Sequence, residues 1–373
     1  MRQRRRNRCH TGLADTGEPS AQKARQGRRV LVIFPGALGD FLCFLPTLAL
    51  LGERHAGAAV ELMARGELGR LAAGRSIVVR AWSIDCREIT ALFSTETDAR
   101  AEAQRFFGGF SFVYSFFASN DATFRQNLQA AARKKAAFYP FRAPLPGHVA
   151  TGWLNSTDWP IGDDTMSRIL AQPCLKVLNE DCERAADRLG ALGLSPRRFV
   201  LLFPGSGGAH KNWPTENYMA LGRAIERSFA LRPVMVLGPA EAEMAATLAA
   251  ISRETRGCEL LSGLDLAEVL GLARLAAFFV GNDSGLSHLA AAAGAPGVAL
   301  FGPTDPLRWR PLGNVGVIQH EPLAQLAVES VLSAIREAVS GAATSQVRQS
   351  LADVPFNSTA IKPKAKGRPA AAD

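Results

Sequence analysis

The sequence lacks several patterns that would place it in a familiar class. Its six cysteines are scattered, with no Cys-x-x-Cys pair and no regular spacing. Neither a disulfide framework nor a zinc site is therefore indicated, and reduced thiols are expected. No stretch reaches the roughly 18 consecutive apolar residues of a membrane-spanning helix. The most apolar run, residues 41–51, is shorter than this and contains Pro46. The arginine-rich N-terminus has no apolar segment after it, so a secretory signal is not indicated, although an organellar transit peptide stays open.

Three phosphate-binding signatures are also missing. No Gly-x-x-x-x-Gly-Lys-Ser/Thr loop occurs, so the chain is not expected to be a P-loop enzyme. No Gly-x-Gly-x-x-Gly follows either of the two first strands proposed below, which argues against an NAD-dependent dehydrogenase. The sequence also has no Asp-x-Asp pair of the kind that could hold a metal diphosphate.

The net positive charge lies in the two ends of the chain, because positive and negative residues nearly balance in the body between them. Of the formal net charge of +9, residues 1–29 carry +7 and residues 341–373 carry +3, whereas the body between them carries −1. This distribution does not support nucleic-acid binding. We expect disordered tails at 1–28 and 341–373, which could also be attracted weakly to anionic lipid headgroups.

Short apolar runs alternate with helix-like runs twice along the chain. This pattern predicts parallel sheets covered on both faces, and its repetition predicts two Rossmann-like domains. We assign them to residues 29–180 and 181–340. The predicted strands are 30–34, 59–64, 77–84, 110–117 and 135–141 in the first half, and 199–203, 233–238, 258–263, 277–283, 297–302 and 315–319 in the second; the last predicted helix is 322–339.

The two first strands end alike, as RVLVIFPGALGD at 29–40 and RFVLLFPGSGGAHKNWP at 198–214. In open α/β sheets, ligands bind at the carboxyl ends of the strands. We therefore expect the two strand ends to face each other across a cleft. Asp40, which follows the first of them, is either a helix cap or a general base aimed into that cleft.

The second half contains three further candidate binding segments. In FFVGNDSGLSHLAAAAG at 278–294, a helix opens near Ser284, and its free amides form a potential anion site. Asp283 and Ser284 are either caps or ligand contacts, Gly285 would let a ligand approach the backbone, and His288 lies one turn further on. The other two segments contribute the polar strand-end residues Ser206, Lys211 and Glu241, with Glu241 placed where an acidic residue often binds ribose.

These segments, in this order, resemble those of glycosyltransferase family 9, the ADP-heptose lipopolysaccharide heptosyltransferases. The resemblance rests on LGDFLCFLPTLALL, KNWP, GNDSGLSHLAAAAG and LFGPTDP, and it extends over about residues 29–340. It implies the GT-B fold, two Rossmann-like domains with parallel sheets facing across a cleft, and sugar transfer without a metal or other cofactor.

The resemblance also implies a role for each matched residue. Asp40 would take the proton of the acceptor hydroxyl. Ser206 and Lys211 would contact the donor diphosphate, with Ser284, Gly285 and His288 at the helix start. Glu241 would bind the ribose, and Asp283 the donor sugar. Two glycines follow Ser206 where the family often has another small polar residue, so this part of the site would offer only backbone amides.

The function expected from the resemblance is inverting transfer of heptose from ADP-heptose to a lipopolysaccharide core or related glycan. The enzyme would be cytoplasmic, with peripheral contact to the inner membrane surface and no nucleic-acid partner. Two alternatives stay open: a nucleotide-sugar epimerase on the same architecture, and a non-catalytic nucleotide-sugar binding protein. Residues 66–180 carry no recognisable motif, so the acceptor is not specified by the sequence.

Overall fold

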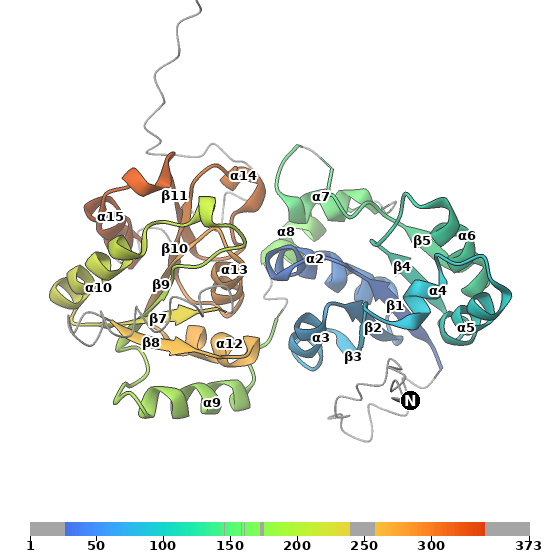
Figure 1. Ribbon diagram of the computed structural model, residues 1–373, viewed down its shortest axis with the longest axis horizontal. Helices are drawn as coiled ribbons and strands as arrows, with labels where there is room; N and C mark the ends of the chain where they lie inside the picture. Colours follow the sequence, from blue (N-terminus) through green and yellow to red (C-terminus); the bar gives the residue numbers. More distant parts are fainter. Residues whose placement is uncertain are drawn as a thin grey trace, which may run out of the picture.

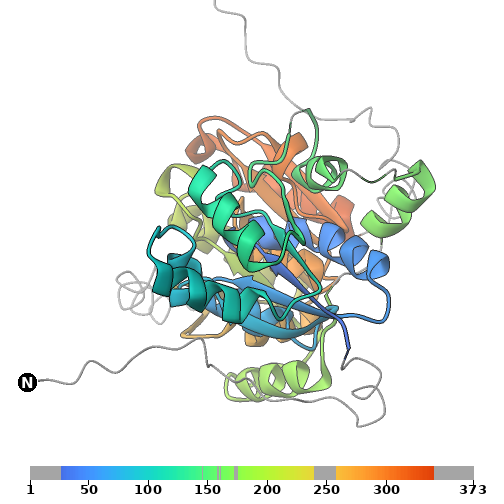
Figure 2. The same ribbon diagram turned by 90° about the vertical axis from the view of Figure 1, so that its right-hand side faces the viewer.

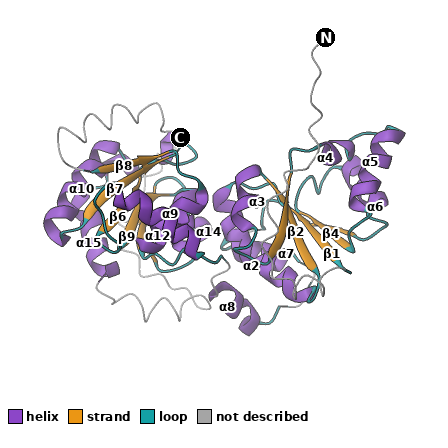
Figure 3. Ribbon diagram, turned by 90° about the horizontal axis from the view of Figure 1, so that it is seen from below, coloured by secondary structure: helices purple, strands orange, loops and turns teal. Residues whose placement is uncertain are grey.

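The computed structural model describes residues 27–144, 146–157, 159, 161–171, 175–238 and 258–339. Two α/β domains lie side by side, the N-terminal one in blue to green and the C-terminal one in yellow to red (Figure 1). Each has a parallel sheet with helices on both faces (Figure 3). The predicted fold class is therefore confirmed, whereas the boundary at residue 180 stays a prediction.

The N-terminal sheet has the strand order β3-β2-β1-β4-β5, and all four strand pairs are parallel. β1 is buried from Val30 to Ile33, and β2 is buried throughout, as expected for strands covered by helices on both sides. The strands are β1 (Arg29–Ile33), β2 (Ala59–Ala64), β3 (Val78–Ser83), β4 (Phe112–Ser115) and β5 (Ala136–Phe138).

Seven helices belong to this half of the described chain or lead out of it. They are α2 (Leu38–Arg54), α3 (Gly66–Ala72), α4 (Arg87–Ala91), α5 (Thr97–Phe107), α6 (Ala122–Ala131), α7 (Val149–Ser156) and α8 (Asp163–Ala171). α7 and α8 both contact α2. An aromatic cluster fixes α2 against the sheet, with the Phe34 and Phe44 rings stacked at 4.2 Å and Trp153 of α7 against both.

The C-terminal sheet has the order β11-β10-β9-β6-β7-β8, again with every pair parallel. Its strands are β6 (Phe199–Phe203), β7 (Arg232–Leu237), β8 (Glu259–Ser262), β9 (Phe278–Asn282), β10 (Gly297–Phe301) and β11 (Val315–Gln319). Its helices are α9 (Asn179–Gly190), η1 (Ala209–Lys211), α10 (Thr215–Phe229), α12 (Leu266–Leu275), α13 (Gly285–Ala292), α14 (Pro306–Trp309), η3 (Leu323–Gln325) and α15 (Val328–Val339).

Each sheet has a point where the strand order reverses, between β1 and β4 in the first and between β6 and β9 in the second. Chains leaving neighbouring strands at such a point run in opposite directions, which opens a crevice at the carboxyl ends of the strands. Asp40 follows β1, Lys211 follows β6, and Asp283 follows β9. The topology therefore places all three beside a reversal point.

The two domains are in contact at several places along their shared boundary. α2 of the N-terminal domain packs against α13 of the C-terminal domain. Figure 2 shows the molecule from the side, with the N-terminal domain in front of the C-terminal one. Arg75, after α3, pairs with the fully buried Asp181 of α9 through two guanidinium nitrogens. Near the opposite end, Arg308 donates to the carbonyl oxygen of Ala143 at 2.6 Å, and the His148 Nε2 lies 2.8 Å from the Arg310 carbonyl oxygen.

Two predictions about secondary structure need correction or comment. The segment 322–339 is not one helix, because the turn η3 ends at Gln325 and α15 begins only at Val328. A helix expected between β7 and β8 lies outside the described residues, as do the residues 1–26 and 340–373 that hold almost all of both predicted tails. Among the described residues, no helix is both long and apolar enough to cross a membrane.

Candidate functional site

Asp40 lies in the first turn of α2, directly after the loop that leaves β1. Its Oδ2 accepts a hydrogen bond from the Ala37 backbone N–H at 3.1 Å. The carboxylate therefore does cap its own helix, and its partly buried side chain is still available for other contacts. The capping and catalytic interpretations are compatible, since a carboxylate has more than one acceptor position.

The surroundings of Asp40 are partly apolar and otherwise cationic. Burial raises the pKa of this carboxyl above its ordinary value, and the Ala37 N–H, Arg142, Lys211 and Arg65 act in the opposite direction. Lys211 belongs to the C-terminal domain, so a positive charge on the other side of the domain boundary lowers the pKa of Asp40. A carboxylate with a raised pKa is a stronger base than an exposed one.

Lys211 and Asp283 form an ion pair at the reversal point of the C-terminal sheet. The Lys211 ammonium donates to Asp283 Oδ2 at 2.8 Å, and the Thr304 hydroxyl donates to the same oxygen at 2.7 Å. The Asp283 side chain is only 8% exposed, whereas that of Lys211 is 27% exposed. Lys211 is thus not a solvated lysine, because the carboxylate holds it at the strand ends.

A buried asparagine connects the loops on either side of this pair. Asn282 is fully buried, and its Oδ1 accepts from the Trp213 backbone N–H at 3.1 Å and from the Tyr218 hydroxyl at 3.0 Å. Its Nδ2 donates to the Pro204 carbonyl at 2.6 Å. These bonds fix the Lys211 loop against the end of β9, so the position of the ion pair depends on Asn282.

The start of α13 faces the start of α2. Ser284 is the N-cap residue, and its Oγ accepts from the Ser287 backbone N–H at 3.4 Å. A Cβ placed on Gly285 would lie 2.9 Å from the Leu38 Cβ, so in this structure Gly285 allows close approach of α2. The capping interpretation of Ser284 is confirmed, and the space beside Gly285 is taken by the Leu38 side chain.

His288 lies one turn further along α13, between the two domains, and is 5% exposed. Its Nδ1 is 3.5 Å from the Cys43 Sγ of α2. Burial lowers the pKa of His288 to about 4, and the charges of His148 and Lys211 act in the same direction, whereas Asp283 and a hydrogen bond to the Trp309 backbone act against them. The imidazole is consequently neutral at neutral pH.

Ser206 and Glu241 are the two remaining residues predicted to bind the donor. Ser206 closes a local turn, since its Oγ donates to the Gly208 carbonyl at 2.8 Å and accepts from the Gly208 N–H at 3.2 Å. Gly207 beside it is exposed, with open space at its Cα. Glu241 lies outside the described residues.

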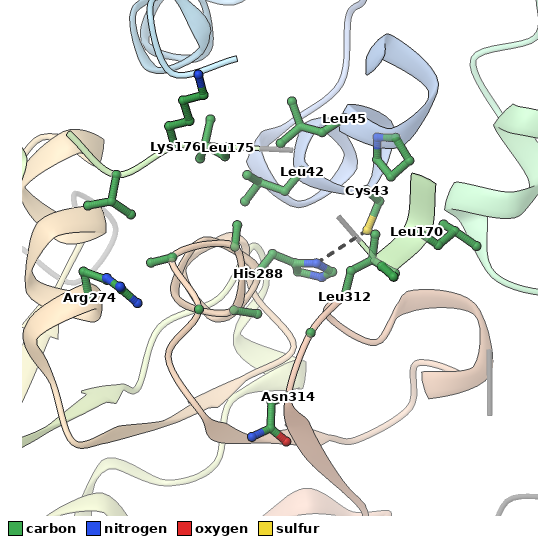
Figure 4. A pocket seen from close by; sticks show the side chains of 18 of the residues that line it. Leu42, Cys43, Leu45, Leu170, Leu175, Lys176, Arg274, His288, Leu312 and Asn314 are labelled. Carbon is green, nitrogen blue, oxygen red and sulfur yellow. Dashed lines mark hydrogen bonds between the residues drawn. The ribbon is translucent and has the colours of Figure 1, made fainter. Parts of the chain in front are cut away.

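A cavity of about 700 Å³ lies behind the contact between α2 and α13 (Figure 4). Of the predicted site residues, only His288 lines it. Most of the remaining lining is apolar and comes from α2, α8, α13 and the segment 175–178. Cys43 and His288, which contact each other, both line this cavity, whereas Asp40 and Asp283 do not.

Sequence reasoning found Asp40, Lys211 and Asp283, but it assigned no role to Asn282, Thr304 or Cys43. Asn282 and Thr304 belong to the segments GNDSGLSHLAAAAG and LFGPTDP, and a polar residue at or shortly after the end of a buried strand is a usable signal: Asn282 is the last residue of β9, and Thr304 lies just beyond β10. Cys43 gives no such signal, because it reads as one more apolar residue of α2. Among the described residues, no group of three or more His, Cys, Asp or Glu side chains is arranged to hold a metal ion.

Comparison with known proteins points to one family. The model of glycosyltransferase family 9 (heptosyltransferase) matches residues 170–369, which is more than half of the chain. Lipopolysaccharide heptosyltransferase 3 of Escherichia coli (strain K12) is 32% identical over 139 residues. That alignment covers 35% of this chain and 39% of the relative, so the similarity in sequence spans well under two thirds of the curated protein.

Two solved structures resemble the whole described architecture. The glycosyl transferase family 9 protein of Veillonella parvula DSM 2008 superposes with a TM-score of 0.67 at 17% identity, covering 84% of this chain and 97% of that one. The ADP-heptose lipopolysaccharide heptosyltransferase II of E. coli gives a TM-score of 0.65 at 20% identity, covering 84% and 99%. At these identities the likeness establishes a shared fold.

Proposed function

Because the chain belongs to glycosyltransferase family 9, we propose that it transfers heptose from ADP-heptose to a lipopolysaccharide core or related glycan, inverting the anomeric centre. The observation that carries this proposal is that Asp40 of one domain lies close enough to the Lys211–Asp283 pair of the other for the Lys211 charge to lower its pKa. A base on one side and diphosphate-binding groups on the other are what sugar transfer from a nucleotide diphosphate needs.

The diphosphate of the donor would bind at the C-terminal strand ends. Breaking the sugar–phosphate bond leaves negative charge on the departing ADP, and stabilising that charge is the main electrostatic task. The amides at the start of α13, the Lys211 ammonium and the turn around Ser206 are cationic or hydrogen-bond donors, and they need no metal for this purpose. Asp283, held by Lys211 and Thr304, would accept from hydroxyl groups of the donor sugar.

The acceptor would bind at the N-terminal strand ends. Asp40 would take the proton from the acceptor hydroxyl as that oxygen attacks the anomeric carbon from the face opposite the diphosphate. The raised pKa of Asp40 suits this task, since the base then has more driving force for proton transfer. Direct displacement of this kind inverts the configuration of the sugar.

Two exposed arginines next to Asp40 support an anionic acceptor. Arg65 follows β2 and donates to the Pro35 carbonyl at 3.0 Å, and Arg142 follows β5. Both lower the pKa of Asp40, so both are close enough to interact electrostatically with its carboxylate. A carboxylated or phosphorylated saccharide, such as a lipopolysaccharide core, would be attracted to this edge.

The test is incubation of the protein with ADP-heptose and a truncated lipopolysaccharide acceptor, with chelator present in one arm. We expect ADP release and an acceptor heavier by one heptose in both arms, and both products formed at least about 100-fold more slowly with Asp40→Asn. An altered sugar nucleotide formed without acceptor would instead indicate an epimerase. Tight donor binding with no turnover under any acceptor would indicate a binding protein, and transfer lost with chelator would remove the metal-independent mechanism.

Cytoplasmic location and contact with the inner membrane belong to the same proposal. They are supported by the intracellular supply of nucleotide sugars that such a reaction would require. Removal of residues 1–28 should leave turnover unchanged and weaken binding to anionic vesicles at low salt. Equal vesicle binding by the shortened chain would mean that the basic tail does not contribute.

A further inference from the structure

Arg308 connects the C-terminal domain to one short segment of the N-terminal domain. It lies on α14, and its guanidinium donates to the carbonyl oxygen of Ala143 at 2.6 Å and to those of Pro144 and Gly147 at 3.4 Å each. Figure 1 shows α14 at the edge of the C-terminal domain that faces α7. One side chain therefore holds three carbonyl groups of the other domain, a task that suits the several N–H donors of arginine.

The segment that Arg308 holds begins directly after Arg142, one of the two exposed arginines next to Asp40. Burial raises the pKa of the Asp40 carboxyl, and the nearby cations Arg142, Lys211 and Arg65 lower it, Arg142 the most of the three. Arg308 is not among these cations, so it has no comparable direct effect on the carboxyl. Any influence of Arg308 on the base would therefore have to pass through the segment that it holds.

The backbone on the two sides of Arg142 is held by different domains. On one side, the Nε1–H of Trp153 on α7 donates to the Phe141 carbonyl at 2.9 Å, within the N-terminal domain. On the other side, the Ala143 carbonyl accepts the shortest of the three bonds from Arg308. The position of Arg142 relative to the proposed base therefore depends on a side chain of the C-terminal domain.

Arg308 is also closely connected to the proposed donor site. Thr304, whose hydroxyl donates to Asp283 at 2.7 Å, lies four residues before it along the chain. Asp305 caps α14, since its Oδ1 accepts from the Leu307 N–H at 2.9 Å. The path from the Asp283 contact to Arg308 thus consists of a bonded threonine and one capped helical turn, which leaves the guanidinium little freedom to move relative to the donor groups.

We propose that Arg308 is a positioning residue for the acceptor: by binding the three carbonyls that follow Arg142, it fixes this arginine beside Asp40 and aligns the acceptor side of the site with the donor side. The inference rests on the proposed function, because Arg142 is there assigned to an anionic acceptor. Arg308 acts through Arg142 and needs no contact with substrate. Without its guanidinium, the segment would be bonded to the C-terminal domain only through His148 and the Arg310 carbonyl.

The first experiment reads the position of Arg142 on the free protein, through the pKa of Asp40. Protein labelled with ¹³C at the aspartate carboxyls is titrated by NMR, with the Asp40 signal assigned through Asp40→Asn. Arg142→Gln should raise this pKa by roughly 0.2–0.5 units, as expected for the loss of one nearby charge in partly wet surroundings. Arg308→Gln should raise it in the same direction, by about half as much or more.

A double-variant cycle separates this path from a general disturbance of the site. If Arg308 acts through Arg142, Arg308→Gln should no longer change the pKa of Asp40 in the Arg142→Gln background. Arg308→Lys keeps the charge but replaces the planar fork by one ammonium, so it should give an intermediate pKa. Arg336→Gln is the matched control, because Arg336 is an exposed arginine of the same domain, on α15, and it should leave the pKa unchanged.

The second experiment measures the effect on the acceptor by steady-state kinetics. With ADP-heptose and the truncated lipopolysaccharide acceptor, Arg308→Gln should raise KM for the acceptor by about 3- to 10-fold, while ADP affinity without acceptor stays within about 2-fold. In the Arg142→Gln background, the same change should alter the acceptor KM by about 2-fold or less. Melting curves of each variant check that it is folded.

Three results would overturn the proposal: an unchanged pKa of Asp40 in Arg142→Gln or in Arg308→Gln, additive effects of the two changes, or a fall in ADP affinity as large as the rise in acceptor KM. Failure of the proposed function looks different. A wild type that binds ADP-heptose but transfers no sugar would refute that function, whereas the pKa cycle on the free protein would still decide whether Arg308 positions Arg142.

Discussion

The ion pair between Lys211 and Asp283 makes Lys211→Met an informative substitution. Methionine keeps much of the length and apolar character of the lysine stem but removes the ammonium. In the wild type the ammonium bonds to Asp283 Oδ2 at 2.8 Å, and after the change only the Thr304 hydroxyl still donates to that oxygen. The carboxylate, whose side chain is 8% exposed, then has much less compensation for its burial.

The cost to stability can be estimated from this geometry. A hydrogen bond to a charged group is worth roughly 1.5–3 kcal/mol, and the 27% exposure of the Lys211 side chain argues for the lower part of that range. We expect a loss of about 2 kcal/mol, or roughly 4–8 °C in the melting temperature of a domain of this size. The double variant Lys211→Met with Asp283→Asn should recover most of this loss, because no buried charge is left unpaired.

The effect on donor binding follows from the same contact. A free ammonium would contribute about 10- to 100-fold to the affinity for a diphosphate. Here the ammonium already bonds to Asp283, so part of that gain is offset when it turns toward the ligand. We therefore expect ADP to bind about 10-fold more weakly to Lys211→Met, and adenosine, which has no phosphate, to bind as before.

Isothermal titration with ADP and adenosine measures both affinities, with circular dichroism melting curves to check folding. Turnover should fall more than ADP affinity, since the charge on the diphosphate increases as the sugar leaves. Equal ADP affinity in wild type and Lys211→Met would refute the diphosphate role of Lys211. A drop in adenosine affinity of the same size would show that the change had disturbed the site as a whole.

Further predictions concern the base, the two histidines His148 and His288, and Asn282. Asp40→Asn should lower turnover by about 100-fold or more while ADP affinity stays within a few-fold, and retained turnover would exclude Asp40 as the base. The same variant should melt at a higher temperature at neutral pH, with the difference vanishing in acid, because the raised pKa of Asp40 makes its ionised form destabilising; a constant difference in melting curves across pH would contradict this. Burial lowers the pKa of both His148 and His288 from 6.5 to about 4, so each contributes stability that is lost as pH falls between these values, by up to about 1.4 kcal/mol per pH unit. Urea unfolding from pH 7 to 4 should be less steeply pH-dependent in His148→Gln, and an unchanged slope would contradict a lowered pKa of His148 in the folded protein. Asn282→Ala should cost about 2–4 kcal/mol in urea unfolding, because the buried Trp213 N–H and Tyr218 hydroxyl lose their acceptor, and a loss below about 1 kcal/mol would show that Asn282 does not hold the loops together.

The sequence by itself determined the architecture and the order of the site residues along it. The alternation of apolar strands with helices is a local pattern of the sequence. It predicts the fold class, because a parallel sheet is stable only when helices cover both of its faces. Phe203 is the last residue of β6 and Phe34 directly follows the last residue of β1, close to the ends predicted from the repeated Phe-Pro-Gly. Asp40, Lys211 and Asp283 follow β1, β6 and β9, which the sequence predicted as strands. The break between η3 and α15 was missed, since the helical pattern continues through residues that form a separate turn.

Tertiary structure alone decided which of these residues meet. Lys211 bonds to Asp283 across 72 positions of the chain, and Cys43 meets His288 across 245. Neither pairing leaves a periodic trace in the sequence, because each depends on how the domains or strand ends are brought together. Leu38 beside Gly285 and Asp181 paired with Arg75 arise in the same way. A local pattern fixes which face of a helix is buried, but the partner on that face is set by long-range packing, where shape and charge at the domain boundary determine the contacts.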